Sequence, residues 1–342
     1  MPNRDIVVIG ASAGGVEALR EVVSRLPADF PAAMLVVLHL PATGTSALPQ
    51  ILDRAGPLSA KQAEDGDPLA PGHILVGAPN RHLIVYDGRV TLSNGPTENG
   101  HRPAIDVLFR TAARVYGPRA IGVVLSGALD DGTAGMVAIR LCGGTGVVQS
   151  PDDALHPSMP RSAMLMAEVK HAVPASEIAP LLVDLVADAV DPDGGAASRL
   201  MTTEVAMAEL DIDALNDGER PGRPAGLSCP DCNGTLYEIE EGGLVRYRCR
   251  IGHAWSPESL AAQQASALES ALWMALRGLE EKAALTRDLA LRAEAAGHRL
   301  SRETFDHESQ EAHRAATLVR NLIDEIASGA STTPAMGETG GR

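Results

Sequence analysis

Residues 6–15 read Ile-Val-Val-Ile-Gly-Ala-Ser-Ala-Gly-Gly, and this stretch decides which fold the chain can adopt. The apolar run 6–9 is typical of a strand that is covered on both faces. Apolar residues then recur at helical spacing from Val16 to Leu26, until Pro27 ends the pattern. Because the glycines in between permit a tight turn, we predict a buried strand, a sharp turn and a helix.

The turn carries one hydroxyl group, Ser12, in the spacing Gly10-x-Ser12-x-Gly14 of a nucleophile elbow. Backbone N–H groups at the start of the following helix can hold an oxyanion. Two other interpretations remain open. The stretch resembles a degraded dinucleotide-binding fingerprint, although the next strand ends in His39-Leu40-Pro41 and lacks the acidic residue that this fingerprint needs. A purely structural glycine-rich turn is the third interpretation.

Residues 1–190 alternate strand and helix patterns, which predicts an α/β fold: a doubly wound, mostly parallel sheet in a three-layer α/β/α arrangement. Two apolar runs around Asp87-Gly88 predict an antiparallel hairpin at one edge of the sheet. The strands are expected at 5–10, 33–39, 73–78, 120–126, 144–149 and 169–173, the hairpin at 82–86 and 89–92, and the helices at 15–26, 104–116, 132–141, 160–168 and 175–189.

The rest of the chain has a different composition. Asp, Gly and Pro are frequent in residues 191–226, which predicts a linker interrupted by one weak amphipathic stretch at 200–215. Residues 256–328 are rich in Ala, Leu, Glu and Arg and predict long helices, with a break at Gly297. Their apolar spacing fits a helical hairpin, or a coil that serves partner binding or self-association. The small, polar tail 329–342 is predicted to be disordered.

Composition argues against several function classes. The formal net charge of −15 over 342 residues disfavours nucleic-acid binding as the main task, because phosphate neutralisation needs a basic surface. The apolar runs are far shorter than the ~20 residues of a membrane span, and no secretory signal pattern opens the chain. We therefore expect a cytoplasmic protein without direct membrane insertion.

Cys229-Pro-Asp-Cys232 and Cys249-Arg-Ile-Gly-His253 form a C-x2-C pair and a C-x3-H pair, sixteen residues apart. The two strand-like runs between the pairs should form a hairpin that brings the four side chains together. Four such ligands suit tetrahedral Zn²⁺, which predicts a zinc ribbon in residues 227–255; unligated thiols are the alternative. A complete Cys3His set leaves no coordination position for water, so we expect a structural zinc.

Loops that follow parallel strands meet at the carboxyl edge of a doubly wound sheet. Ser12 follows the first expected strand, His39 ends the second, and Asp130 and Asp131 follow the strand at 120–126. These residues are a nucleophile, a general base and an acid that orients the base, which is the set that acyl transfer needs. Taken singly, His39 fits a core histidine and the Asp pair fits a helix N-cap; their coincidence at strand ends favours catalysis.

Several separated motifs resemble those of chemotaxis-type protein-glutamate methylesterases. Residues 9–15 are similar to that family's serine loop, residues 38–41 to its histidine loop and residues 126–132 to its aspartate loop. Further similar motifs are Pro71-Gly72, Ala78-Pro79, His82-Leu83, His101-Arg-Pro103, Asp106-Val-Leu-Phe109 and Met159-Pro160. The resemblance covers about residues 4–188.

The resemblance implies a Ser12 nucleophile, a His39 general base and, by motif register, Asp131 as the orienting acid. It also implies that the substrate is a methylated receptor or another signalling protein, whose glutamate methyl esters are hydrolysed with release of methanol. Related members also deamidate glutamine side chains in the same kind of substrate protein.

The chain departs from the family pattern at several points. Ala13 stands where the family usually has threonine and Ala128 where it has methionine. Asp130 replaces the usual asparagine before the catalytic aspartate, so either aspartate is a candidate partner of His39. The chain starts at the first strand, without the receiver domain and linker that usually precede it, so we expect a stand-alone enzyme. The alternative is a weakly active or inactive scaffold that binds signalling partners through its zinc ribbon and helices.

Overall fold

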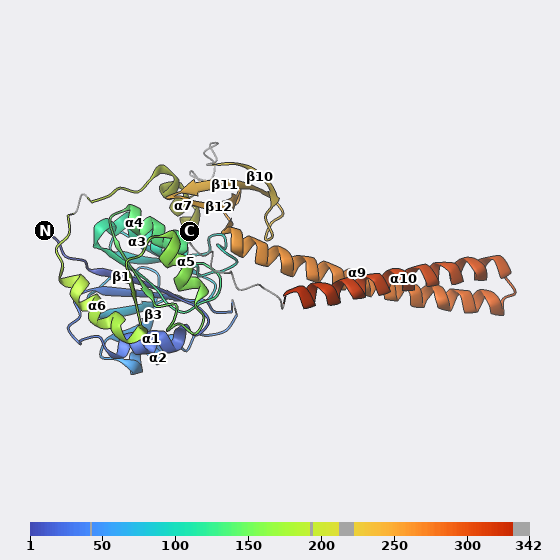
Figure 1. The fold of residues 1–342 in the computed structure, drawn as a ribbon, viewed down its shortest axis with the longest axis horizontal. Helices are drawn as coiled ribbons and strands as arrows, with labels where there is room; N and C mark the ends of the chain where they lie inside the picture. Colours follow the sequence, from blue (N-terminus) through green and yellow to red (C-terminus); the bar gives the residue numbers. More distant parts are fainter. Residues whose placement is uncertain (42, 192–193, 212–221, 331–342) are drawn as a thin grey trace, which may run out of the picture. The chain divides into compact units, whose positions relative to one another are not determined.

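The structure is a computed structural model that describes residues 1–41, 43–191, 194–211 and 222–330 (Figure 1). These residues belong to two compact units, Met1–Ala261 and Ala262–Arg342. Among the described residues, no helix is both long and apolar enough to cross a membrane.

A sheet of seven strands forms the centre of the first unit, in the order β3-β4-β2-β1-β7-β8-β9. Its strands are β1 (Ile6–Ala11), β2 (Ala33–Leu38), β3 (Ser59–Gln62), β4 (His73–Val76), β7 (Ala120–Val124), β8 (Thr145–Gln149) and β9 (His171–Val173). Every neighbouring pair is parallel. The predicted parallel sheet is therefore confirmed, with one edge strand, β3, that the sequence analysis missed.

Helices cover both faces of this sheet, because successive side chains of the central strands point to opposite sides. The helices are α1 (Gly15–Ser24), α2 (Leu48–Ala55), α3 (Ile105–Tyr116), α4 (Thr133–Leu141), α5 (Ser158–Met166) and α6 (Ala175–Ala187). Val7 and Ile9 share a core cluster with residues of α1, α2 and α6, whereas Ile6 and Val8 share one with residues of α3, α4 and α5. Figure 1 shows α1 and α2 on one side of the sheet and α3 and α4 on the other.

The predicted hairpin forms, but its predicted place at the edge of the parallel sheet is wrong. β5 (His82–Tyr86) and β6 (Arg89–Ser93) pair antiparallel as a separate two-stranded sheet. Leu83 and Val90 are fully buried in the core cluster that also contains Leu108 of α3. The hairpin therefore buries its apolar face on a helix and does not extend the main ladder of hydrogen bonds.

Much of the predicted linker is structured and packed within the first unit. α7 (Arg199–Glu209) buries Met201 and Ala208 and contacts α3. β10 (Arg223–Ser228) opens a four-stranded antiparallel sheet, the small sheet, whose other strands are β11 (Thr235–Glu241), β12 (Leu244–Cys249) and β13 (Ala254–Trp255). The predicted linker is thus corrected: helix and strand occupy much of it, while residues 192–193 and 212–221 lie outside the described residues.

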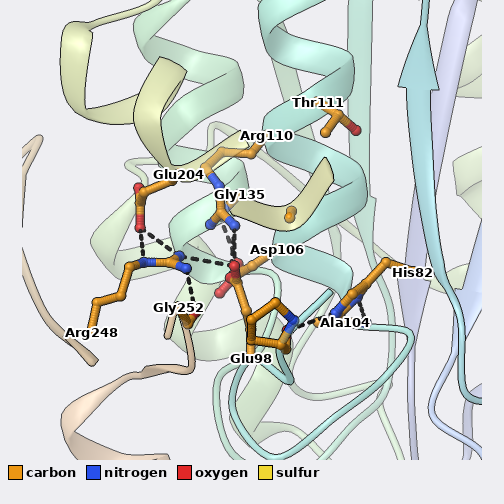
Figure 2. A network of polar contacts seen from close by, with 12 residues as sticks. His82, Glu98, Ala104, Asp106, Arg110, Thr111, Gly135, Glu204, Arg248 and Gly252 are labelled. Atoms are coloured by element: carbon orange, nitrogen blue, oxygen red, sulfur yellow. Dashed lines mark hydrogen bonds and ion pairs between the residues drawn. The ribbon is translucent and has the colours of Figure 1, made fainter. Parts of the chain in front are cut away.

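Five buried charged side chains fasten the small sheet and α7 to α3. Glu98 accepts two hydrogen bonds from Arg110 Nη2, each 2.7 Å long. Glu204 of α7 is bound in bidentate fashion by Arg246, at 2.7 and 2.8 Å, and is bound by Arg248 at 2.7 Å. Arg248 Nη2 also donates to Glu98 at 2.9 Å, which joins both groups into one network (Figure 2). Because buried ions need partners, each of these side chains depends on the others.

The second unit is built from two long helices. α9 (Pro257–Ala295) enters it from the first unit, and α10 (Arg299–Ala330) returns after Gly297, which has a φ of 74° and lies at the predicted break. The apolar core between the helices contains Leu272, Leu276, Leu279, Ala316, Val319 and Ile323. Self-association through these helices stays a prediction, because the structure holds one chain. Of the predicted disordered tail, residues 331–342 lie outside the described residues.

Replacement of Glu204 by glutamine should strongly destabilise the first unit. Arg246 and Arg248 would remain buried without their main countercharge, and breaking a buried ion pair in this way costs about 3–5 kcal/mol. The free energy of unfolding, measured by urea denaturation, reports the loss. Glu209→Gln on the same helix is the control, because it breaks a contact with Arg114 whose side chains are both 22% exposed. The control should cost about 1 kcal/mol or less, and equal losses for the two variants would contradict the prediction.

Candidate active site

A tight turn after β1 presents Ser12 at the carboxyl edge of the sheet. Gly14 has a φ of 71°, in the left-handed region, and a Cβ at this position would lie 2.8 Å from Ser126 Oγ. The neighbouring loop fixes the turn, since Ser12 N donates to Ser126 O at 2.9 Å and Ser126 Oγ donates to Ala13 O at 2.8 Å. The glycine spacing therefore holds the hydroxyl group at a defined place beside the ends of β2 and β7.

Three strand ends bring Ser12, His39 and Asp131 together, and we call these residues the triad. His39 Nδ1 lies 3.2 Å from Ser12 Oγ, and His39 Nε2 lies 2.7 Å from Asp131 Oδ2. The side chains of His39 and Asp131 are only 6% and 2% exposed, so their contact is shielded from water. With its proton on Nε2, His39 donates to Asp131 and leaves Nδ1 able to accept the Ser12 proton.

The structure distinguishes the two neighbouring aspartates that the sequence left open. Asp131 faces His39, whereas Asp130 Oδ1 accepts hydrogen bonds from Ser256 Oγ at 2.7 Å and from Ser259 Oγ at 3.1 Å. Asp130 is therefore bound to the residues that follow the small sheet, and Asp131 is the partner of His39.

Four donors surround the buried carboxylate of Asp131. Besides His39, the N–H groups of Ile105 and Asp106 donate to it at 2.7 and 3.3 Å, and Asn99 Nδ2 donates at 3.1 Å. Both N–H groups belong to the start of α3, and a helix N-terminus favours a negative charge. Burial opposes ionisation, but His39 and the Ile105 N–H hold the pKa of Asp131 well below its usual range. Asp131 is therefore an ionised hydrogen-bond acceptor.

Two further side chains lie against the triad, and sequence reasoning assigned them no role. The ring of His101 stacks on that of His39 with centroids 3.6 Å apart and an interplanar angle of 11°. Burial and the neighbouring His39 lower the pKa of His101 to about 4, so its ring is neutral near pH 7. Asp106 accepts from two N–H groups at the start of α4, and burial together with the Asp131 charge raises its pKa. Both residues lie in motifs that the sequence analysis noted, but spacing alone does not reveal these contacts.

Backbone donors for an oxyanion follow Ser12 directly. In the part of the chain that the structure describes, neither the Ala13 N–H nor the Gly14 N–H donates to a protein acceptor. Preorganised N–H groups of this kind stabilise the negative oxygen that develops during acyl transfer. The turn can therefore supply both a nucleophile and its oxyanion donors.

The small sheet gathers Cys229, Cys232, Cys249 and His253, whose ligand atoms all lie within 4.8 Å of one another. The Sγ atoms of Cys232 and Cys249 are 3.7 Å apart, and Cys249 Sγ lies 3.5 Å from His253 Nδ1. Tetrahedral coordination with metal–sulfur bonds of about 2.3 Å places two sulfur atoms about 3.8 Å apart. The spacing and chemistry of this donor set fit Zn²⁺.

A serine, an imidazole and a carboxylate in series at the carboxyl edge of a doubly wound sheet are the arrangement of a serine hydrolase. Comparison with known families gives a match of residues 7–182 to the family described as CheB methylesterase. The chain belongs to this family.

Similar proteins carry the corresponding name. A protein-glutamate methylesterase/protein-glutamine glutaminase of Xanthomonas campestris pv. campestris is 38% identical over 188 residues, 54% of this chain and 52% of the relative. One from Symbiobacterium thermophilum is 37% identical over 189 residues, 55% of this chain and 52% of the relative. The chain thus spans about half the length of the curated relatives it matches. The crystal structure of the Thermotoga maritima CheB methylesterase catalytic domain matches with a TM-score of 0.52 and 33% identity, and the match covers 54% of this chain and 100% of that domain.

The titration of Asp130 predicts a pH-dependent stability. Burial raises its pKa from 3.8 to about 6, opposed by the hydrogen bond from Ser256 and reinforced by the charge of Glu258. The unfolded chain therefore releases this proton at a lower pH than the folded protein, so stability should fall as the pH rises from about 4 to about 6.

Asp130→Asn removes this titration and keeps an oxygen that can accept from the two serines. Relative to this variant, the wild-type free energy of unfolding should fall by about 2 kcal/mol between pH 4 and pH 7. Urea denaturation of both proteins across this range measures the difference. Parallel pH dependences for the two proteins would show that Asp130 has an ordinary pKa in the folded state.

Proposed function

We propose that this chain is a serine esterase that removes methyl groups from glutamate side chains of a signalling protein and also deamidates glutamine there. The observation that supports this most is the series of contacts from Ser12 through His39 to Asp131. The names of the relatives over the matched half of the chain contain both activities. The proposed substrate is a cytoplasmic segment of a chemoreceptor-like protein.

The proposed reaction begins when Ser12 Oγ attacks the γ-carbonyl carbon of the ester while His39 Nδ1 takes the hydroxyl proton. The N–H groups of Ala13 and Gly14 hold the oxyanion. His39 then gives the proton to the leaving methoxide, methanol departs, and Ser12 remains as a glutamyl ester. Water, deprotonated by His39, hydrolyses this ester and releases the glutamate carboxylate. Asp131 orients the ring and stabilises the imidazolium throughout. With glutamine as substrate, the leaving group is ammonia.

The substitution of alanine for the usual threonine after the serine is compatible with this reaction. Ala13 would act through its backbone N–H, which the side chain does not alter. The hydrogen bond from Ser126 Oγ to Ala13 O, 2.8 Å long, holds the next peptide group, whose N–H is the other oxyanion donor, that of Gly14. An active enzyme therefore has more support than the inactive scaffold.

We also propose that Cys229, Cys232, Cys249 and His253 bind a structural Zn²⁺. The support is the convergence of four suitable donors within 4.8 Å. Four protein ligands leave no coordination position for water, so the metal would stabilise the small sheet and take no part in hydrolysis. A sheet of this size buries too little apolar surface to be stable alone, and a metal supplies the missing stability.

Ester hydrolysis tests the catalytic role of the triad. With a peptide that carries a glutamate γ-methyl ester, methanol release by wild type should be lowered about 10⁴-fold or more by Ser12→Ala and about 10⁴-fold by Asp131→Asn. Ser24→Ala is the matched control, because Ser24 is an exposed serine near the end of α1. Equal rates for wild type and Ser12→Ala would favour the scaffold.

Metal analysis tests the zinc proposal. The purified full chain should contain about one zinc ion per molecule, and Cys232→Ser should lose most of it, because a three-ligand site binds more weakly. Cys142→Ser is the control, since Cys142 is buried in the apolar core of the parallel sheet and is not part of the Cys/His cluster. Elemental analysis after gel filtration gives the number of zinc ions per protein molecule. Unchanged zinc in Cys232→Ser would refute the assignment.

A further inference from the structure

The residues that follow the last ligand of the Cys/His cluster run alongside the loop that holds Asp131. Ala254, directly after His253, donates its N–H to Thr97 O at 3.3 Å and accepts from Asn99 N at 2.8 Å. Two residues further on, Ser256 N donates to Asn99 Oδ1 at 2.8 Å. β13 therefore holds the backbone of Asn99, and Ser256, the residue after β13, holds its side chain.

Asn99 has one orientation that satisfies its neighbours. Its side chain is buried, and Nδ2 donates to Asp131 Oδ1 and to Asp106 Oδ2, both at 3.1 Å. A flipped amide would set its oxygen against the ionised carboxylate of Asp131 and its NH₂ group against the Ser256 N–H, which pairs an acceptor with an acceptor and a donor with a donor. The hydrogen bond from Ser256 thus selects the orientation in which Asn99 donates to Asp131.

Two further connections join the same elements. Ser256 Oγ and Ser259 Oγ donate to Asp130, the residue before Asp131, at 2.7 and 3.1 Å. Arg248, the residue before the ligand Cys249, donates to Glu98, the residue before Asn99, at 2.9 Å (Figure 2). Arg248, next to one ligand, is therefore bonded to the residue before Asn99, and Ser256, three residues after another ligand, is bonded to the residue before Asp131.

We propose that Asn99 is a positioning residue for Asp131 and that the metal-bound small sheet sets its orientation, so that Zn²⁺ binding is required for full esterase activity. The inference rests on the proposed esterase function and on the proposed zinc site. The zinc ion acts at a distance: it holds residues 253–256 in place, these hold Asn99, and Asn99 holds the carboxylate that orients His39.

The first test is the variant Asn99→Ala, which leaves the metal ligands untouched. A misplaced orienting group lowers turnover more than substrate binding, so kcat for the γ-methyl ester peptide should fall about 100-fold with KM changed less than about 3-fold. Ser266→Ala, an exposed serine on α9, is the control. An unchanged kcat, or a loss confined to KM, would overturn the positioning role.

The second test combines this variant with metal loss. Zinc removal by a chelator should lower the wild-type kcat about 100-fold, and addition of zinc should restore it. In Asn99→Ala the same treatment should cost less than about 10-fold more, because the connection from metal to Asp131 is already broken. Independent, multiplying losses would overturn the coupling.

The third test does not depend on activity. The His39 proton that is shared with Asp131 should give a downfield ¹H resonance, which is expected to shift or broaden in metal-free wild type and in Asn99→Ala but not in Ser266→Ala. Slow amide exchange in β1 and β7 must persist, which shows that the parallel sheet is still folded. An identical resonance with and without zinc would overturn the proposal.

If wild type and Ser12→Ala hydrolyse the ester equally, the proposed function fails. The His39 resonance would still show whether the metal positions the triad.

Discussion

A carboxylate that is almost fully removed from water keeps its charge only if hydrogen-bond donors replace the lost water. Asp131 is such a group, and its donors come from the end of β2, the start of α3 and the loop at residues 97–101. If the carboxylate lost these donors and remained buried, its pKa would rise, and His39 would lose the ionised partner that fixes its tautomer. The strand order β2-β1-β7 and the position of α3 therefore depend on each other, because together they surround the charge of Asp131.

The same logic extends outward to the charged network at the small sheet. Two glutamates and three arginines are buried together, and the gain in stability from such a set over an apolar contact is small or negative. The network instead fixes the orientation of the elements that it joins. The bidentate contact of Arg246 with Glu204 allows one geometry, whereas two elements in apolar contact can slide past each other. The orientation of the small sheet is consequently defined by the same kind of interaction that defines the triad.

The sequence was most informative where a pattern is local. Apolar runs marked the buried strands, and the reactive residues at their ends were found because parallel strands end at a common edge. β3 was missed because three of its four residues are exposed, so it has no apolar run. α7 was taken for linker because the burial of Glu204 depends on two arginines more than forty residues away. The contacts of Asn99 with Asp131 and of His101 with His39 also join distant segments, which spacing along the chain does not encode.

The contacts of α7 and of the small sheet also determine where the first unit can be shortened without exposing its interior. The family match ends at residue 182, yet Ala208 packs on Ile84, Ala104 and Val107, and Arg248 binds Glu98. A fragment trimmed at the family boundary would open this apolar surface to water and leave Glu98 with one of its two arginines. The stretch Met1–Ala261 is therefore one compact unit, in which α7 and the small sheet form part of the interior.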